Sequence, residues 1–153
     1  SNTCRFTGHA REFMSVAQHS VIVSDQLRSD ATLALVGLLH DAPEAYLADV
    51  STPIKHALHN YEGIEMGLWR VIAERFNLPD HWLSAVKTAD LRSLATERRD
   101  LMPYHPGEWD TLRGVEPLEQ RIVPLEPKAA KRLFLETFRE LSYRRENLLR
   151  FSQ

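Results

Sequence analysis

The 153-residue chain has a single cysteine, Cys4, so an internal disulfide framework is excluded and the composition fits a reducing compartment. No apolar run approaches the roughly 18 residues that a membrane-spanning helix needs. A secretory signal, in which a basic segment precedes an apolar one, is not visible at the start of the sequence. These absences predict a cytoplasmic protein without a membrane partner.

The chain also lacks an excess of charge of either sign. Its 19 Lys and Arg against 21 Asp and Glu give a formal net charge of -2, which offers no general attraction to nucleic acid or anionic lipid. The basic residues between 128 and 150 alternate with glutamates, which favours a solvated helix face over a nucleic-acid interface. The length fits one globular domain over residues 1–153, with no nucleic-acid partner.

Alternating apolar and polar residues, the pattern of a half-buried strand, form no convincing ladder in this sequence. Apolar positions instead recur every three or four residues, which predicts helices over 30–40, 62–76, 81–101 and 127–149. The segment 103–127 is rich in proline, glycine and charge, and it predicts a long loop or lid. The sequence therefore predicts an all-α helical bundle.

Ionisable side chains interrupt this apolar helical sequence at three separated places, and burying them is costly unless they are paired or bound to metal. The residues concerned are His19, His40, Asp41 and Asp90. Two imidazoles and two carboxylates suit Mn²⁺, Co²⁺, Fe²⁺ or Zn²⁺ better than Ca²⁺, and Mg²⁺ also stays open. The pattern predicts one divalent metal ion held by these four residues.

Each proposed ligand also has an ordinary structural explanation that the residues alone leave open. His19 fits a core histidine whose hydrogen bonds are made within the protein. His40 fits a histidine at a helix end, and Asp41 fits a helix cap. Asp90 fits an N-cap or an ion pair with Lys87 or an arginine. The case for metal depends on the four occurring together.

The ordered pattern H…HD…D resembles that of the HD-domain metal-dependent phosphohydrolases. The resemblance is closer to one branch, the bacterial 5'-deoxynucleotidases and related phage and bacterial nucleotide phosphohydrolases. Four stretches carry it, and together they span about residues 5–100: they are 15–20, 40–44, 49–55 and 87–90. The segment beyond residue 103 carries no motif of this family.

The resemblance assigns catalytic roles to two acids. Glu44 lies three residues after Asp41, on the same side of a helical turn, and resembles the family's catalytic glutamate, which orients or deprotonates the attacking water. Asp49 corresponds to a second family acid, which protonates the leaving sugar oxygen or binds its hydroxyl. From the residues alone, two less favoured alternatives stay open: a solvated helix carboxylate for Glu44, and a cap for the turn at 51–53 for Asp49.

The resemblance also points to substrate-binding residues. Arg5 and Phe6 stand where this branch has an arginine–aromatic pair near the substrate, although the relatives often have tryptophan in place of Phe6. Lys55, with Arg5, would supply positive charge for phosphate. From the residues alone, Arg5 and Lys55 fit positively charged surface side chains equally well.

The resemblance implies an enzyme, a metal-dependent phosphohydrolase that uses a metal-activated water. The substrate implied by the resemblance is a small-molecule nucleotide, most directly a deoxynucleoside 5'-monophosphate, and the relatives imply a homodimer. A nucleoside triphosphate or alarmone phosphohydrolase is an alternative, as is a non-catalytic metal-binding sensor or interaction module. His56 and His59 lack an acidic partner, which favours one metal over two.

Overall fold

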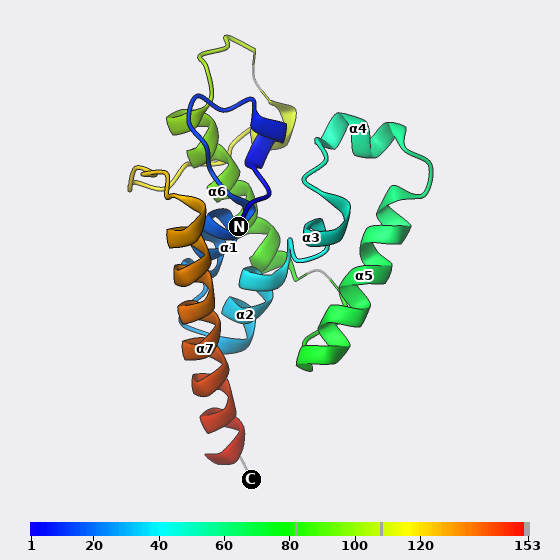
Figure 1. The fold of residues 1–153 in the computed structure, drawn as a ribbon, viewed down its shortest axis with the longest axis vertical. Coiled ribbons are helices and arrows are strands. Elements are labelled where there is room, and N and C mark those ends of the chain that lie inside the picture. The colour runs from blue at the N-terminus through cyan, green and yellow to red at the C-terminus, as the bar shows by residue number, and fades with distance from the viewer. Residues whose placement is uncertain (82, 108, 152–153) are drawn as a thin grey trace.

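The computed structural model describes residues 1–81, 83–107 and 109–151 of the chain. Helices make up its regular structure, and within the described residues the strand-like pairing is confined to an isolated bridge between Cys4 and Ser15 (Figure 1). The predicted all-α fold is confirmed. None of the helices in the described part of the chain is both long and apolar enough to cross a bilayer.

The centre of the fold is a hairpin of α1 (Val16–Asp25) and α2 (Ala31–Leu39). Asp30 begins α2 as a side-chain cap, because its Oδ1 accepts hydrogen bonds from the backbone amides of Thr32 and Leu33. Gly37 permits close contact between the two helices, since a Cβ there would lie 2.9 Å from Leu27 Cδ1 and 3.4 Å from the Ser24 Cα.

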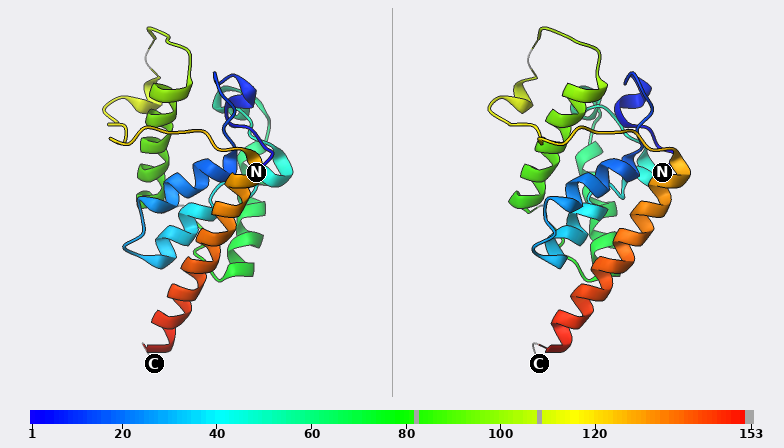
Figure 2. Two further views of the ribbon diagram at one scale, coloured as in Figure 1. Left: turned by 60° about the vertical axis from the view of Figure 1, so that its left-hand side comes forward. Right: turned by 90° about the vertical axis from the view of Figure 1, so that its left-hand side faces the viewer.

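Two longer helices pack against this hairpin, α6 (Ser84–Leu101) and α7 (Pro127–Phe151). In Figures 1 and 2, α7 runs along the hairpin and its last turns extend beyond it to the C-terminus. Buried aliphatic side chains fill the space between these helices, among them Val23, Val36, Leu38, Val86 and Leu141. The apolar periodicity of the sequence is therefore explained by one shared core.

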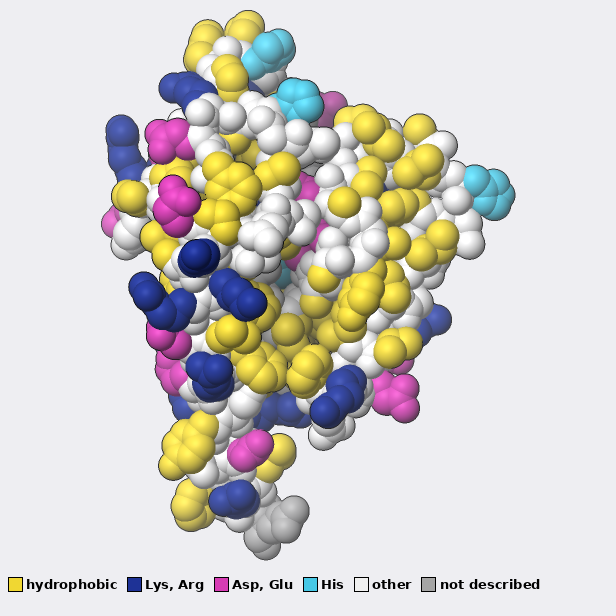
Figure 3. Space-filling model, viewed as in Figure 1, with side chains coloured by type: hydrophobic (Ala, Val, Ile, Leu, Met, Phe, Trp, Pro, Cys, Tyr) yellow, Lys and Arg dark blue, Asp and Glu magenta, His cyan; other side chains and the backbone are white. Residues whose placement is uncertain are grey.

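The chain turns away from the hairpin after α2 and forms α3 (Glu44–Leu47), α4 (Thr52–Ala57) and α5 (Tyr61–Phe76). Among the described residues, Trp69 is the largest fully buried side chain, and with Ala73 it joins α5 to the core. The face of α5 away from the core exposes Ile64 and Val71, and Figure 3 shows hydrophobic surface between α5 and α7.

Segment 103–126 is irregular in its described part, apart from the short 3-10 helix η2 (Asp110–Leu112). Its second half is held on the helices: Thr96 Oγ1 accepts from the Leu118 amide, and the Gln18 side chain bonds both the Val123 carbonyl and the Leu125 amide. These bonds hold residues 118–125 on α6 and α1, and the segment leads directly into α7.

Candidate metal centre

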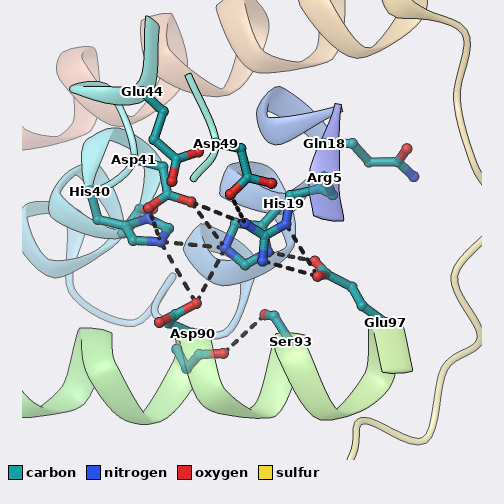
Figure 4. Close-up of polar contacts among 12 residues, drawn as sticks. Arg5, Gln18, His19, His40, Asp41, Glu44, Asp49, Asp90, Ser93 and Glu97 are labelled. Carbon is teal, nitrogen blue, oxygen red and sulfur yellow. Dashed lines mark hydrogen bonds and ion pairs between the residues drawn. The ribbon is translucent and has the colours of Figure 1, made fainter. Parts of the chain in front are cut away.

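Three helices bring the predicted ligands together. His19 lies in α1, His40 ends α2 with Asp41 directly after it, and Asp90 lies in α6. Figure 4 shows the four side chains pointing toward a common centre. Ligand atoms of His19, His40 and Asp41 all lie within 4.8 Å of one another, so these three residues could hold a metal ion.

The distances between ligand atoms match those of a metal's coordination shell. His19 Nε2 lies 3.4 Å from His40 Nε2, 3.4 Å from Asp41 Oδ2 and 3.3 Å from Asp90 Oδ1. His40 Nε2 lies 3.2 Å from Asp41 Oδ1 and 3.9 Å from Asp90 Oδ1. Bonds of about 2.1 Å would place neighbouring ligands about 3.0 Å apart in octahedral and about 3.4 Å apart in tetrahedral geometry. Asp90 thus lies at a ligand's distance from His19, and its Oδ1 is somewhat further from His40.

In each of the two imidazoles, the ring nitrogen that faces away from the cluster has a hydrogen-bond acceptor. His40 Nδ1 lies 2.7 Å from the Gly37 carbonyl oxygen, which can only accept, so Nδ1 carries the proton and Nε2 faces the cluster. His19 Nδ1 lies 2.5 Å from Glu97 Oε1, a second acceptor in the same arrangement. Metal-binding histidines commonly have such a partner on the other ring nitrogen.

The cluster strongly perturbs the protonation of its members. Burial and the Arg5 charge lower the pKa of His19, but Glu97 and Asp90 outweigh both and raise it to about 10. Burial would raise the pKa of Asp90, but the hydrogen bond from His19 and the nearby His40 hold it far below its usual value. The carboxylate is thus ionised and ready to bind a cation, whereas His19 must release a proton to do so.

Asp90 also forms the ion pair with Lys87 that would explain this residue without a metal. Lys87 Nζ lies 3.2 Å from Asp90 Oδ2, while Asp90 Oδ1 faces His19. The Lys87 side chain is 63% exposed, so solvent screens this pair, and its contribution is below about 1 kcal/mol. Pairing with Lys87 therefore leaves one carboxylate oxygen directed at the cluster.

Glu44 lies against the cluster in a buried position. Its residue is 4% exposed, and Oε2 has no hydrogen-bond partner among the described residues. Burial first, and then the charges of Asp41 and Asp49, raise its pKa to about 9, against the opposing effects of Arg5 and Lys55. The alternative of a solvated helix carboxylate is wrong, because water has little access to this side chain.

Asp49 approaches the same centre from the turn after α3, where Ala48 has a positive φ of 63°. Its side chain is mostly buried, and Oδ1 lies 3.8 Å from Arg5 Nη1. In Figure 4 both Asp49 and Glu44 point toward the cluster from the side opposite α6. The Ser51 side chain makes no cap hydrogen bond at the start of α4, and the observed contact of the Asp49 carboxylate is with Arg5.

The three predicted substrate contacts lie around this centre. Arg5 is buried rather than on the surface: Nε and Nη2 both donate to Glu97 Oε2, at 3.2 and 3.1 Å. The Phe6 ring is half-buried next to Arg5 and packs against Trp109 with centroids 6.1 Å apart. Lys55 is also partly buried, with Nζ 2.7 Å from Glu65 Oε1 and 3.7 Å from Glu44 Oε1.

Glu97 is the site residue that the sequence did not reveal. It lies seven residues after Asp90, two helical turns along the same face of α6, and it is fully buried. Extending the stripe of Val86, Asp90 and Leu94 by one more position would have pointed to it. Its place among charged residues near the end of α6 hid that signal.

Two relatives match the chain over long stretches. The uncharacterized protein YfdR of Escherichia coli strain K12 is 42% identical over 143 residues, which cover 93% of this chain and 79% of YfdR. The chain belongs to the YfdR family. A second relative, the uncharacterized protein RCAP_rcc00048 of Rhodobacter capsulatus, is 33% identical over 110 residues, or 65% of this chain and 56% of that protein.

No model of a known protein family matches the chain. The names of the two relatives assign no activity to the YfdR family, so the chemistry has to be argued from the site. Figure 3 shows acidic and histidine side chains in a recess of the molecular surface. The arrangement offers a cation three or four ligands, beside the Glu44 carboxyl, whose pKa burial and the charges of Asp41 and Asp49 raise to about 9.

Proposed function

We propose that this member of the YfdR family is a metal-dependent phosphohydrolase of the HD-domain type, acting on nucleotides. Deoxynucleoside 5'-monophosphates are the substrates that the resemblance favours. The observation that carries the proposal is the convergence of two imidazoles and two carboxylates at distances of 3.2–3.9 Å, with a buried acid beside them.

The residues present fit one divalent cation. His19, His40, Asp41 and Asp90 would hold it, because their free nitrogen and oxygen atoms surround one point and the opposite ring nitrogens face carbonyl or carboxylate oxygens. When bound, such an ion polarises a phosphoryl oxygen and lowers the pKa of a coordinated water. The mixed nitrogen and oxygen set favours Mn²⁺, Co²⁺, Fe²⁺ or Zn²⁺ over Ca²⁺.

Glu44 is the proposed acid–base residue. Efficient acid–base residues have a pKa shifted toward the operating pH, and burial with the charges of Asp41 and Asp49 raises the pKa of Glu44 to about 9, so the carboxyl of the metal-free protein keeps its proton at neutral pH. The unpartnered Oε2 gives it a free atom with which to orient a water, and the positive charge of a bound cation would favour the ionised carboxylate that can accept a proton. A non-catalytic metal-binding module would not need this costly buried group.

Arg5, Asp49 and Lys55 are proposed to act on the substrate. Glu97 occupies one side of the Arg5 guanidinium, and Nη1 on the other side lies 3.8 Å from both Asp41 Oδ2 and Asp49 Oδ1. Nη1 is therefore directed into the site, where it can contact a phosphoryl oxygen. Asp49 would bind a sugar hydroxyl or protonate the leaving oxygen, and Lys55 would add charge from the α4 side.

The test is phosphate release by metal-stripped protein that is refilled with Mn²⁺, Co²⁺, Zn²⁺ or Mg²⁺. The substrates are ribo- and deoxynucleoside mono-, di- and triphosphates, which separates the monophosphatase from the triphosphohydrolase alternative. Glu44→Gln serves as the inactive variant, and Glu74→Gln, an exposed glutamate on α5, as its matched control. Equal release by both variants would contradict the proposal.

A further inference from the structure

Glu97 is buried completely, and its carboxylate is shared between two functional segments. Its exposed fraction is 0%, the lowest value that a charged side chain can have. Oε1 lies 2.5 Å from His19 Nδ1 in α1, and Oε2 accepts two hydrogen bonds from Arg5 in the N-terminal segment. Both partners belong to the candidate metal centre (Figure 4).

The chemistry of this contact fixes the protonation of the imidazole. An ionised carboxylate has no hydrogen to donate, so the bond between Glu97 and His19 requires a proton on Nδ1. Whenever His19 is neutral, its lone pair therefore lies on Nε2. That atom is 3.3 Å from Asp90 Oδ1 and 3.4 Å from Asp41 Oδ2, inside the ligand cluster.

We propose that Glu97 is the positioning residue of the metal centre, holding His19 in the tautomer and ring orientation that binds metal through Nε2. This inference rests on the proposed function to the extent that a metal occupies the centre. The carboxylate does not itself touch the cation, and it acts through the imidazole.

A second consequence follows from the contact with Arg5. Glu97 Oε2 accepts hydrogen bonds from both Nε and Nη2 of Arg5, which fixes the plane of the guanidinium. The third nitrogen, Nη1, therefore faces Asp41 and Asp49. One buried carboxylate thus sets the orientation of a metal ligand and of the arginine proposed to contact phosphate. A role limited to holding the N-terminal segment on α6 would not require the contact with His19.

Glu97→Gln tests the assignment with almost no change in volume. If the amide oxygen of the introduced glutamine accepts from His19, the amide NH₂ faces the N–H donors of Arg5, so two donors oppose each other. If the NH₂ instead faces His19, it needs an acceptor there, and the imidazole proton moves to Nε2. Either arrangement disfavours metal binding through Nε2, and loss of such a second partner weakens affinity about 10- to 100-fold. The readout is the Mn²⁺ or Zn²⁺ dissociation constant from titration calorimetry of the full chain.

Asp100→Asn is the matched control, because Asp100 is a mostly buried carboxylate one turn further along α6. It pairs with Arg99 and accepts from the Ile122 amide, away from the metal centre. We expect the Asn variant to bind metal within about twofold of the unaltered protein. Equal affinities in Glu97→Gln and Asp100→Asn would overturn the positioning role.

A measurement on the unaltered protein covers the case in which Glu97→Gln does not fold. Nitrogen-15 NMR of the Zn²⁺-loaded chain should show a proton on His19 Nδ1 and zinc on Nε2, and a proton on Nε2 would overturn the inference. Both readouts are independent of hydrolysis. A protein that binds metal in this way without releasing phosphate would contradict the proposed enzyme and leave the positioning role standing, whereas absence of metal binding would overturn both.

Discussion

Replacing Glu44 by glutamine is expected to stabilise the metal-free protein while abolishing hydrolysis. The carboxyl is 4% exposed, and Oε2 has no hydrogen-bond partner among the described residues. An amide of the same shape is neutral at every pH, so unlike the carboxyl it does not have to take up a proton to stay uncharged beside Asp41 and Asp49. Catalytic groups are often kept at such a cost to stability.

The size of the effect follows from the pKa of Glu44, which burial and the two neighbouring carboxylates raise from 4.5 to about 9. Between these values the folded protein retains a proton that the unfolded chain has released, so the wild type loses stability as the pH rises. The loss is at most about 1.4 kcal/mol per pH unit, or about 4 kcal/mol at pH 7.5. Allowing for relaxation around the charge, we expect glutamine to gain about 2–4 kcal/mol there.

Urea denaturation of metal-free wild type and Glu44→Gln at pH 5 and at pH 8 measures this difference. The two proteins should have nearly equal unfolding free energies at pH 5, and the variant should be the more stable at pH 8. Asp100→Asn should be less stable than the wild type at both pH values, because hydrogen bonding to Arg99 lowers the pKa of Asp100 and its carboxylate stabilises the fold above about pH 4. A Glu44→Gln variant that is less stable than wild type at pH 8 would refute the reasoning.

Three further changes test the metal centre, the core and the loop. Asp90→Asn removes an anionic ligand, so the rise in melting temperature on adding Mn²⁺ should be lost together with hydrolysis, and an unchanged rise would contradict the ligand role. Trp69→Ala removes a fully buried ring and should lower the unfolding free energy by about 3–5 kcal/mol in urea titrations, where a loss below about 1 kcal/mol would show that the core is wrongly described. Gln18→Ala removes both side-chain bonds to segment 118–125, so amide exchange at Leu125 should accelerate about tenfold or more; an unchanged rate would mean that other contacts hold the segment.

The helices could be predicted closely because their local signals agree with the core. Asp30 was expected to begin a helix and does so as a side-chain cap, and the pattern over 62–76 corresponds to α5 at Tyr61–Phe76. The start of α6 was placed at His81 but lies at Ser84, since Leu83 is still extended with a ψ of 134°. The short 3-10 turn at Arg5–Gly8 has no apolar period and was not predicted.

The candidate site was predictable in part. Ionisable residues inside apolar helical stretches indicated His19, His40, Asp41 and Asp90, and the structure brings them to one point. The network behind them could not be predicted, because the hydrogen bond between Arg5 and Glu97 joins positions 92 residues apart. Such pairs depend on how α6 packs against α1 and the N-terminal segment, which local patterns do not encode.

The most direct test of the account is phosphate release by the metal-stripped chain after it is refilled with a single divalent metal. The account predicts release from deoxynucleoside 5'-monophosphates with Mn²⁺ or Co²⁺, none after chelation, and none from Glu44→Gln that has bound the metal. Stoichiometric metal binding without release from any nucleotide in the panel would contradict the proposed phosphohydrolase and favour a metal-bound, non-catalytic module.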